Sequence, residues 1–189
     1  MADIRTIAVT GAGTRGPDLA QIFALGGFRT ILEDILPASL RRAEDAIRVA
    51  LDRAIEEGAM TRSAVEAALA RMEYASSVEQ AARAADLVIE AVPEELESKI
   101  EIFTLLDKVA RPATILAANT SSFSVTELAS VTYRKEKMVG MRFSIPVGGV
   151  LEIIRGQKTS DETVTVCAAA GRRMGRNVVV IEEALSNER

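Results

Sequence analysis

Short runs of apolar residues alternate with longer amphipathic segments along most of this chain. Such runs are typical of strands buried on both faces, and the amphipathic segments between them are typical of helices. The predicted strands are residues 6–10, 30–33, 87–92, 115–118, 138–143, 151–155 and 177–181. The predicted helices between them are residues 18–25, 95–109, 125–130 and about 162–174. This alternation predicts an α/β fold with a doubly wound, mostly parallel sheet.

One segment interrupts the alternation of strands and helices. Between Pro37 and Leu69 the pattern is that of two charged amphipathic helices, residues 40–57 and 61–69. Gly58 lies between them, and glycine is the residue that most often ends a helix. We therefore expect a helical hairpin, over about residues 37–70, inserted into the sheet domain.

Composition and charge narrow the class of protein. The 189 residues include 23 Lys and Arg and 27 Asp and Glu, and the two signs are interspersed, so no basic patch for nucleic acid is predicted. Cys167, the single cysteine, lies in an apolar run, which indicates a buried structural thiol. No apolar stretch approaches the roughly 18 residues that cross a bilayer, and no signal-peptide pattern is present. We expect a cytoplasmic protein that binds no nucleic acid, membrane or metal.

A glycine-rich turn follows the first predicted strand and precedes the first predicted helix. Gly11, Gly13 and Gly16 have the G-x-G-x-x-G spacing, with Thr14 and Arg15 between the last two glycines. Glycines in this context let the backbone approach a pyrophosphate at a helix N-terminus, where free N–H groups favour negative charge. The turn therefore predicts a Rossmann-type dinucleotide site. Arg15 either contacts the pyrophosphate or points to solvent, and the sequence leaves both open.

A carboxylate ends the second predicted strand. Asp34 follows the glycines by about 20 residues, the distance at which an acidic residue accepts hydrogen bonds from the adenosine ribose hydroxyls. The same charge would repel a 2′-phosphate. The predicted cofactor is therefore NAD in preference to NADP.

Several motifs together resemble one enzyme family. They are the segments 7–16 (IAVTGAGTRG), 89–94 (IEAVPE), 119–122 (NTSS) and 139–143 (VGMRF). In this order they strongly resemble the L-3-hydroxyacyl-CoA dehydrogenases, and the predicted hairpin is similar to that family's extra arm. The resemblance extends over nearly the whole chain. It implies a role in fatty acid metabolism.

The resemblance implies positions for several site residues. Glu94 and Lys99 would lie beside the nicotinamide end of NAD, Asn119 would belong to the cofactor site, and Ser121 would reach both cofactor and acyl substrate. Without the resemblance, Glu94 and Lys99 would be interpreted as a solvated strand end and an exposed helix charge. Asn119, Ser121 and Ser122 would be interpreted as a capping or turn cluster.

The chain departs from the family at its catalytic base. Where the family has a histidine the chain has Arg142, and where it has an asparagine the chain has Ile145; the sequence contains no histidine at all. The glutamate that orients the family's histidine is matched by Glu152. Arginine stays protonated up to a pKa above about 12 and cannot act as a base at neutral pH. Losing general acid–base help typically costs about 10²- to 10⁴-fold in rate.

Three roles for Arg142 remain open at this point. It could polarise a ketone and stabilise a developing alkoxide, which would favour reduction by NADH. It could bind a substrate carboxylate through its fork of N–H donors. It could also form an ion pair with Glu152 that only holds two strands together. Glu152 would accordingly orient Arg142 or serve as a surrogate base.

The resemblance also sets expectations for function and partners. We expect a single NAD-binding domain over residues 1–189, without the helical domain that completes the family's acyl cleft and dimer. The expected function is an NAD(H)-dependent oxidoreductase for a 3-hydroxy or 3-keto acyl thioester, bound to CoA or a carrier. The expected assembly is a homo-oligomer or a complex with a partner subunit. The alternative is a catalytically silent NAD-binding subunit or cofactor sensor.

Overall fold

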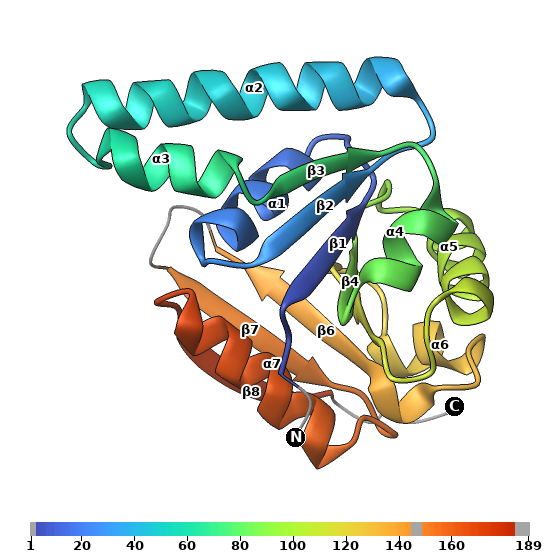
Figure 1. The fold of residues 1–189 in the computed structure, drawn as a ribbon. Coiled ribbons are helices and arrows are strands. Elements are labelled where there is room, and N and C mark those ends of the chain that lie inside the picture. The colour runs from blue at the N-terminus through green and yellow to red at the C-terminus, as the bar shows by residue number, and fades with distance from the viewer. Residues whose placement is uncertain (1–2, 145–148, 184–189) are drawn as a thin grey trace.

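The computed structural model describes residues 3–144 and 149–183, and its centre is one sheet (Figure 1). The strands are β1 (Thr6–Thr10), β2 (Arg29–Glu33), β3 (Met72–Ala75), β4 (Leu87–Glu90), β5 (Ile115–Ala118), β6 (Met138–Phe143), β7 (Val150–Arg155) and β8 (Asn177–Glu182). Their order is β3-β2-β1-β4-β5-β6-β7-β8. The strands from β3 to β6 are parallel, β7 is antiparallel to β6, and β8 is parallel to β7. This confirms the predicted mostly parallel Rossmann-type sheet.

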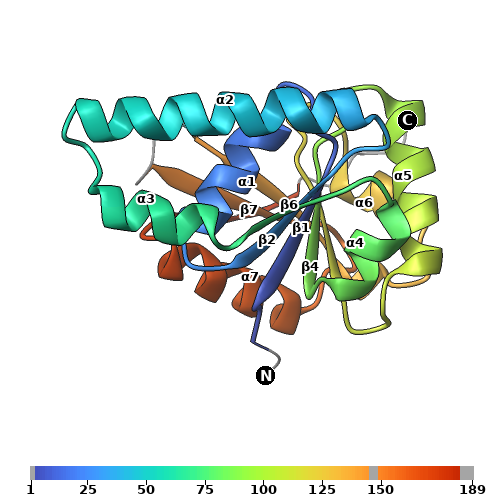
Figure 2. The same cartoon turned by 45° about the horizontal axis from the view of Figure 1, so that its top comes forward.

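Helices cover both faces of the sheet (Figure 2). They are α1 (Gly16–Leu25), α2 (Pro37–Glu56), α3 (Arg62–Leu69), α4 (Val78–Ala84), α5 (Leu96–Val109), α6 (Val125–Ser130) and α7 (Asp161–Arg173), with a short 3₁₀ turn at Lys135–Lys137. Buried residues of α1, α2, α3 and α7 share one apolar cluster, and those of α4, α5 and α6 share a second. The domain is therefore a three-layer α/β sandwich with the sheet in the middle.

The alternation of side chains along β1 explains why two clusters form. Ile7 and Val9 face the first cluster, whereas Ala8 faces the second, and all are fully buried. A central strand that packs helices on both faces needs apolar residues at consecutive positions. This is the pattern that predicted the strand from the sequence.

The predicted helical hairpin is confirmed as α2 and α3, which lie antiparallel beside one another and pack on α1 (Figure 1). Gly58 lies in the turn between them with a φ of +71°, a conformation that glycine adopts without strain. Thr61 caps α3 by accepting a hydrogen bond from the Ala64 N–H group. The hairpin joins β2 to β3, so it is an insertion at one edge of the sheet.

Some predicted boundaries were wrong. The sequence predicted no element between residues 70 and 86, yet β3 and α4 lie there. The helix predicted from residue 18 begins at Gly16, with Pro17 in its first turn, where a missing N–H group is tolerated. The strand predicted to residue 92 ends at Glu90, because the chain leaves the sheet at Ala91 to line the cleft described below.

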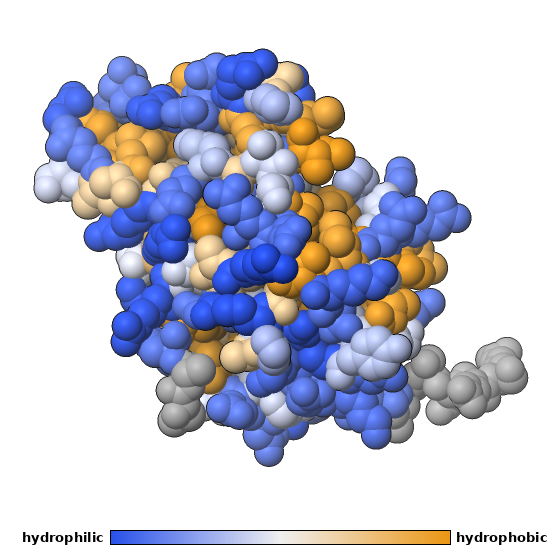
Figure 3. Space-filling view, turned by 45° about the vertical axis from the view of Figure 1, so that its right-hand side comes forward, coloured by the Kyte–Doolittle hydropathy of each residue, from blue (hydrophilic) through white to orange (hydrophobic). Residues whose placement is uncertain are grey.

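Seven large apolar side chains are exposed within the described ranges. They are Ile35, Leu36, Val49, Leu105, Tyr133, Val179 and Val180. On the face shown in Figure 3, the apolar surface is broken up by polar residues. The predicted homo-oligomer or partner complex stays a prediction. No helix within the described ranges has the length and hydropathy needed to cross a bilayer.

Candidate functional site

The glycine-rich turn lies where the strand order reverses, at the carboxyl ends of β1 and β4. Gly11 has a φ of +104°, and a Cβ atom there would lie 2.8 Å from the Ala91 carbonyl oxygen. A Cβ atom on Gly16 would lie 1.9 Å from the Gly11 oxygen. At Gly13, by contrast, a Cβ atom would meet nothing within 4 Å. Two glycines thus let the backbone pack on itself, and the third leaves open space above the turn.

That open space belongs to a cleft of about 500 Å³. The cleft is lined by Gly11, Gly13, Thr14, Arg15, Asp34, Ala91, Val92, Pro93, Glu94 and Asn119. Two of the predicted glycines, Gly11 and Gly13, line the cleft, and α1 begins at Gly16 in the same turn. Ligands of doubly wound sheets bind at such a crevice, where the strand order reverses. A helix N-terminus and an unfilled position at Gly13 fit a dinucleotide pyrophosphate.

Asp34 is held rigidly at the edge of this cleft. Its Oδ2 atom accepts a hydrogen bond from the Ala12 N–H group at 2.9 Å, and its Oδ1 atom accepts one from the Leu36 N–H group at 2.9 Å. Each carboxylate oxygen can accept further hydrogen bonds. Asp34 thus lines the cleft with both carboxylate oxygens held by backbone N–H groups, and its contact with a ribose stays a prediction.

Lys99 does not line the cleft: its side chain is completely buried and contacts Glu94, which does. Its Nζ atom donates to both carboxylate oxygens of Glu90 at 2.8 Å, lies 2.9 Å from Glu94 Oε2, and donates to the Asn119 carbonyl oxygen at 3.4 Å. Burial raises the pKa of Glu90 to about 7, against the opposing effect of the Lys99 charge. The interpretation of Lys99 as an exposed helix charge was therefore wrong.

Glu94 connects this buried cluster to the loop after β5. Its Oε1 atom accepts hydrogen bonds from the Thr120 hydroxyl group and from the N–H groups of Ser121 and Ser122. Burial works to raise the pKa of Glu94, but the bonds from Thr120 and Lys99 outweigh it and hold the pKa below its usual value. Glu94 is therefore an ionised group that fixes the backbone around Ser121.

A second cavity of about 360 Å³ adjoins the cleft. It is lined by Arg15, Glu94, Asn119, Thr120, Ser121, Arg142 and Phe143. Arg15, Glu94 and Asn119 line both spaces, so the two are adjacent. We call this second space the arginine cavity. It brings together predicted residues that are separated by more than a hundred positions in the sequence.

Arg142 and Glu152 are directly opposite one another in the register of β6 and β7. Nε of Arg142 donates to Glu152 Oε2 at 2.8 Å, and Nη2 lies 2.7 Å from the same oxygen in an ion pair. The ion pair considered in the sequence analysis is therefore present. Arg142 lines the arginine cavity, whereas Glu152 is not among the described residues that line it.

Arg15 lines the cleft beside the glycine-rich turn, so its contact with a pyrophosphate stays a prediction. Its Nη2 atom donates to the Phe143 carbonyl oxygen at 3.1 Å, and its Nη1 atom lies 4.0 Å from Asp18 Oδ2. The side chain therefore crosses from the glycine-rich turn to β6. It forms one wall between the cleft and the arginine cavity.

Sequence reasoning missed two residues of the site. Glu90 is a charged residue at the end of an otherwise apolar strand, and that unusual position was the available signal. The Thr120 hydroxyl group both donates to Glu94 and accepts from the Phe123 N–H group, which shapes the loop. Ile145, a predicted departure from the family, lies outside the described residues.

Cys167 is buried, and burial raises its pKa to about 12, which confirms the predicted structural thiol.

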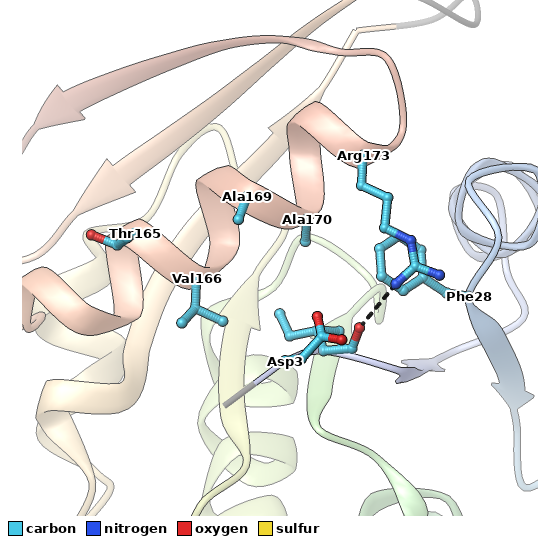
Figure 4. A pocket seen from close by; sticks show the side chains of 8 residues that line it. Asp3, Phe28, Thr165, Val166, Ala169, Ala170 and Arg173 are labelled. Carbon is cyan, nitrogen blue, oxygen red and sulfur yellow. Dashed lines mark hydrogen bonds between the residues drawn. The ribbon is translucent and has the colours of Figure 1, made fainter. Parts of the chain in front are cut away.

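A separate cavity of about 230 Å³ lies at the amino ends of β1 and β2, away from the glycine-rich turn (Figure 4). It is lined by Asp3, Ile4, Phe28, Thr165, Val166, Ala169, Ala170 and Arg173. Arg173 donates to the carbonyl oxygens of Gly27 and Ile4, and its guanidinium lies 4.2 Å from the centre of the Phe28 ring. None of the predicted site residues lines this cavity. The contacts of Arg173 connect α7 to the residues that precede β1 and β2.

Known proteins are similar to this chain in sequence and in fold. The family model described as "3-hydroxyacyl-CoA dehydrogenase, NAD binding domain" matches residues 6–184. A probable 3-hydroxybutyryl-CoA dehydrogenase of Bacillus subtilis is 37% identical over 183 residues, which cover 96% of this chain and 63% of that protein. A 3-hydroxyadipyl-CoA dehydrogenase of Escherichia coli is 37% identical over 166 residues, covering 87% of this chain and 35% of that protein.

Solved structures agree with the sequence comparisons. The crystal structure of (S)-3-hydroxybutyryl-CoA dehydrogenase from Ralstonia eutropha superposes with a TM-score of 0.91 at 34% identity. The match covers 96% of this chain and 65% of that protein. The chain thus spans less than two thirds of the length of these relatives. The glycine-rich turn, the fold and these matches show that the chain belongs to the 3-hydroxyacyl-CoA dehydrogenase family, whose NAD-binding domain it contains.

Proposed function

We propose that the protein is an NAD(H)-dependent oxidoreductase that acts on a 3-hydroxy or 3-keto acyl thioester, carried by CoA or by a carrier protein. One observation carries the proposal: the cleft at the glycine-rich turn lies beside the arginine cavity, which Ser121 and Arg142 both line. Bound NAD(H) supplies hydride transfer. The protein's residues would bind the cofactor, hold the substrate carbonyl group and stabilise the negative charge that develops on its oxygen.

The cofactor-binding roles follow from the contacts around the cleft. The N–H groups around Gly13 and Thr14 would hold the pyrophosphate at the start of α1, and Asp34 would accept the ribose hydroxyl groups. Glu94 lines the cleft and is held by the buried Lys99, and this pair would set the position of the nicotinamide. Gly11 and Gly16 act through the backbone packing that shapes the turn.

Arg142 would act on the substrate carbonyl. Among residues 3–144 and 149–183, its Nη1 atom has no hydrogen-bond partner, so it can donate to a carbonyl oxygen in the cavity. A guanidinium stays charged and stabilises negative charge that develops on that oxygen, which favours reduction of a ketone. Glu152 is a positioning residue that holds the guanidinium. The proton that completes the alcohol would come from water.

The partners and location of the protein are also proposals. The arginine cavity, at about 360 Å³, is too small to enclose a long acyl chain together with its carrier. We therefore expect a second copy or a partner subunit to cover the rest of the substrate, and Ser121 to contact the acyl group. The single free thiol of Cys167 is compatible with the reducing cytoplasm.

The first test follows NADH in the presence of acetoacetyl-CoA. Binding is measured from the fluorescence of NADH, and turnover from the loss of its absorbance at increasing protein concentration. Saturable binding together with loss of NADH in proportion to protein supports the proposal. Absence of NADH binding would overturn both the cofactor assignment and the enzyme.

The second candidate is an NAD-binding subunit or cofactor sensor without catalytic activity. It is favoured by the Arg142–Glu152 ion pair, in which the position of the family's base is occupied by a group that cannot accept a proton. NADH binding without turnover would support it. The Arg142→His variant then distinguishes two cases. A site that lacks only its base would gain activity, whereas a site that also lacks other catalytic or substrate-binding groups would stay inactive.

A further inference from the structure

We propose that the arginine cavity is a carboxylate-binding site, in which Arg15 and Arg142 together hold a free carboxylate that lies close to the substrate's carbonyl group. The inference rests on the proposed function in one respect: it places this carboxylate beside the nicotinamide end of the cofactor cleft. Within the proposed class, the favoured substrate is therefore a keto acyl thioester that carries a free carboxylate, and a short keto acid serves as its simplest probe. A neutral acyl chain would offer no charged partner to Nη1 of Arg142 or Nε of Arg15.

Two elements bring the guanidinium groups to the same space. Arg15 comes from the glycine-rich turn and Arg142 from β6, and both line the cavity. The bond from Arg15 Nη2 to the carbonyl oxygen of Phe143 holds the first guanidinium beside the residue that follows Arg142. Arg15 is thus drawn away from the turn and toward the wall that carries the second cation.

Both guanidinium groups keep donors for a ligand. Within the described ranges, Nη1 of Arg142 and Nε of Arg15 have no hydrogen-bond partner. The side chains are 36% and 41% exposed, so a ligand can reach them. Guanidinium groups bind carboxylates through paired N–H donors, and such charge-assisted bonds are stronger than neutral ones. Ser121 and Asn119 line the same cavity.

The negative charges nearby are already committed. Glu94 accepts hydrogen bonds from Thr120, Ser121 and Ser122 and is paired with Lys99, so it is not free to neutralise Arg15. The charge nearest to Arg15, Asp18, lies at the 4.0 Å limit of an ion pair. A ligand carboxylate would therefore add an attraction that the protein itself does not supply.

Comparison with a second cross-strand pair shows that Glu152 does not use the fork of Arg142 fully. Arg29 on β2 donates to two different oxygens of Glu73 on β3, at 2.6 and 2.8 Å, as an efficient structural brace does. Arg142 donates one hydrogen bond, from Nε, to Glu152 Oε2, and its Nη2 atom approaches the same oxygen, so this pair does not use the second carboxylate oxygen. This geometry holds the guanidinium in place and leaves its remaining amino group for the cavity.

The test compares acetoacetate with its neutral methyl ester. The full chain is titrated with each compound by calorimetry at constant ionic strength, once saturated with NADH and once without it. Acetoacetate should bind at least about ten-fold more tightly than methyl acetoacetate. Arg142→Gln and Arg15→Gln should each weaken acetoacetate binding about ten-fold, whereas Arg142→Lys, which keeps the charge but not the fork, should lie in between.

The matched control is Arg29→Gln, which removes a cross-strand Arg–Glu pair at the far end of β2. It should bind acetoacetate as the unmodified chain does, and circular dichroism of every variant checks that it is folded. Equal binding of acid and ester, or an acid preference that survives in the Arg15→Gln/Arg142→Gln double variant, would overturn the carboxylate site. If NADH fails to bind while acetoacetate binding still depends on Arg142, the proposed function fails and the carboxylate site stands.

Discussion

The ammonium nitrogen of Lys99 lies 2.8 Å from each carboxylate oxygen of Glu90, and neither side chain is exposed to solvent. This pair joins the end of β4 to the first turns of α5. Glu94, which lines the cleft, also forms an ion pair with Lys99, so the cleft wall at Glu94 is supported by the buried Glu90–Lys99 pair. Removing one partner of such a pair leaves the other buried without compensation, which is strongly destabilising.

Replacing Lys99 with methionine should therefore lower the free energy of unfolding by about 3–5 kcal/mol. Urea unfolding followed by circular dichroism measures the loss. Lys108→Met, at an exposed position of the same helix, should change it by no more than about 0.5 kcal/mol. The double variant Glu90→Gln/Lys99→Met should recover part of the loss. A Lys99→Met loss as small as that of Lys108→Met would contradict the importance of the buried pair.

Asp34 should control which cofactor binds. The Asp34→Asn variant removes the negative charge at the cleft edge, so NADH affinity should fall by about ten-fold as ribose contacts weaken. NADPH affinity should rise because a 2′-phosphate no longer meets a carboxylate. Fluorescence titrations with both cofactors measure the change in preference, with Asp52→Asn on the exposed side of α2 as the control. An unchanged NADH to NADPH preference would remove Asp34 from the ribose site.

Glu33 should make stability fall as pH rises. Its side chain is 2% exposed, and burial, together with the nearby Asp34 charge, raises its pKa to about 7. Because the folded state then binds a proton that the unfolded state has released, the free energy of unfolding decreases between about pH 4.5 and pH 7. Two and a half pKa units correspond to at most about 3 kcal/mol.

The Glu33→Gln variant isolates this effect from that of Glu90, whose pKa is raised in the same direction. Chemical unfolding at a series of pH values should show a smaller decrease for Glu33→Gln than for the unmodified chain. Glu66→Gln, at an exposed position of α3, should follow the unmodified chain. Parallel curves for all three proteins would mean that Glu33 is ionised in the folded state at no cost.

Two glycines of the same turn should respond differently to alanine. A methyl group on Gly16 would lie 1.9 Å from the Gly11 carbonyl oxygen, so Gly16→Ala should destabilise the fold by about 3 kcal/mol or more. Gly13→Ala meets no protein atom within 4 Å and should unfold like the unmodified chain. Its methyl group would enter the cleft, so its NADH affinity should fall. Unchanged NADH binding by a folded Gly13→Ala protein would place the pyrophosphate elsewhere.

The central strands and their mostly parallel arrangement could be predicted from the sequence because these strands are mostly apolar and alternate with helices. The strand β3 could not, because it is a four-residue edge strand with one buried residue. The helix α4 has seven residues, too few for a clear helical period. Its available signal was Ser77, whose hydroxyl group accepts from the Gln80 N–H group as a helix cap does.

The site was predicted less completely than the fold. The positions of Asp34 and the glycines follow from local spacing, and those of Glu94, Lys99 and Ser121 followed from a family resemblance. The burial of Lys99 depends on Glu90, and the route of Arg15 depends on Phe143, more than a hundred residues away. Such contacts are set by the packing of strands that are distant in the sequence, and local patterns do not specify them.

Arg173 donates to the carbonyl oxygen of Ile4 across 169 positions of the chain, and it covers the ring of Phe28. During synthesis, the amino-terminal strand leaves the ribosome long before the helix that carries Arg173 has been made. The sheet around β1 can begin to form early through its neighbours β2 and β4. Its apolar end stays uncovered until translation has passed α7, so a nascent chain stalled before that helix should depend on chaperones.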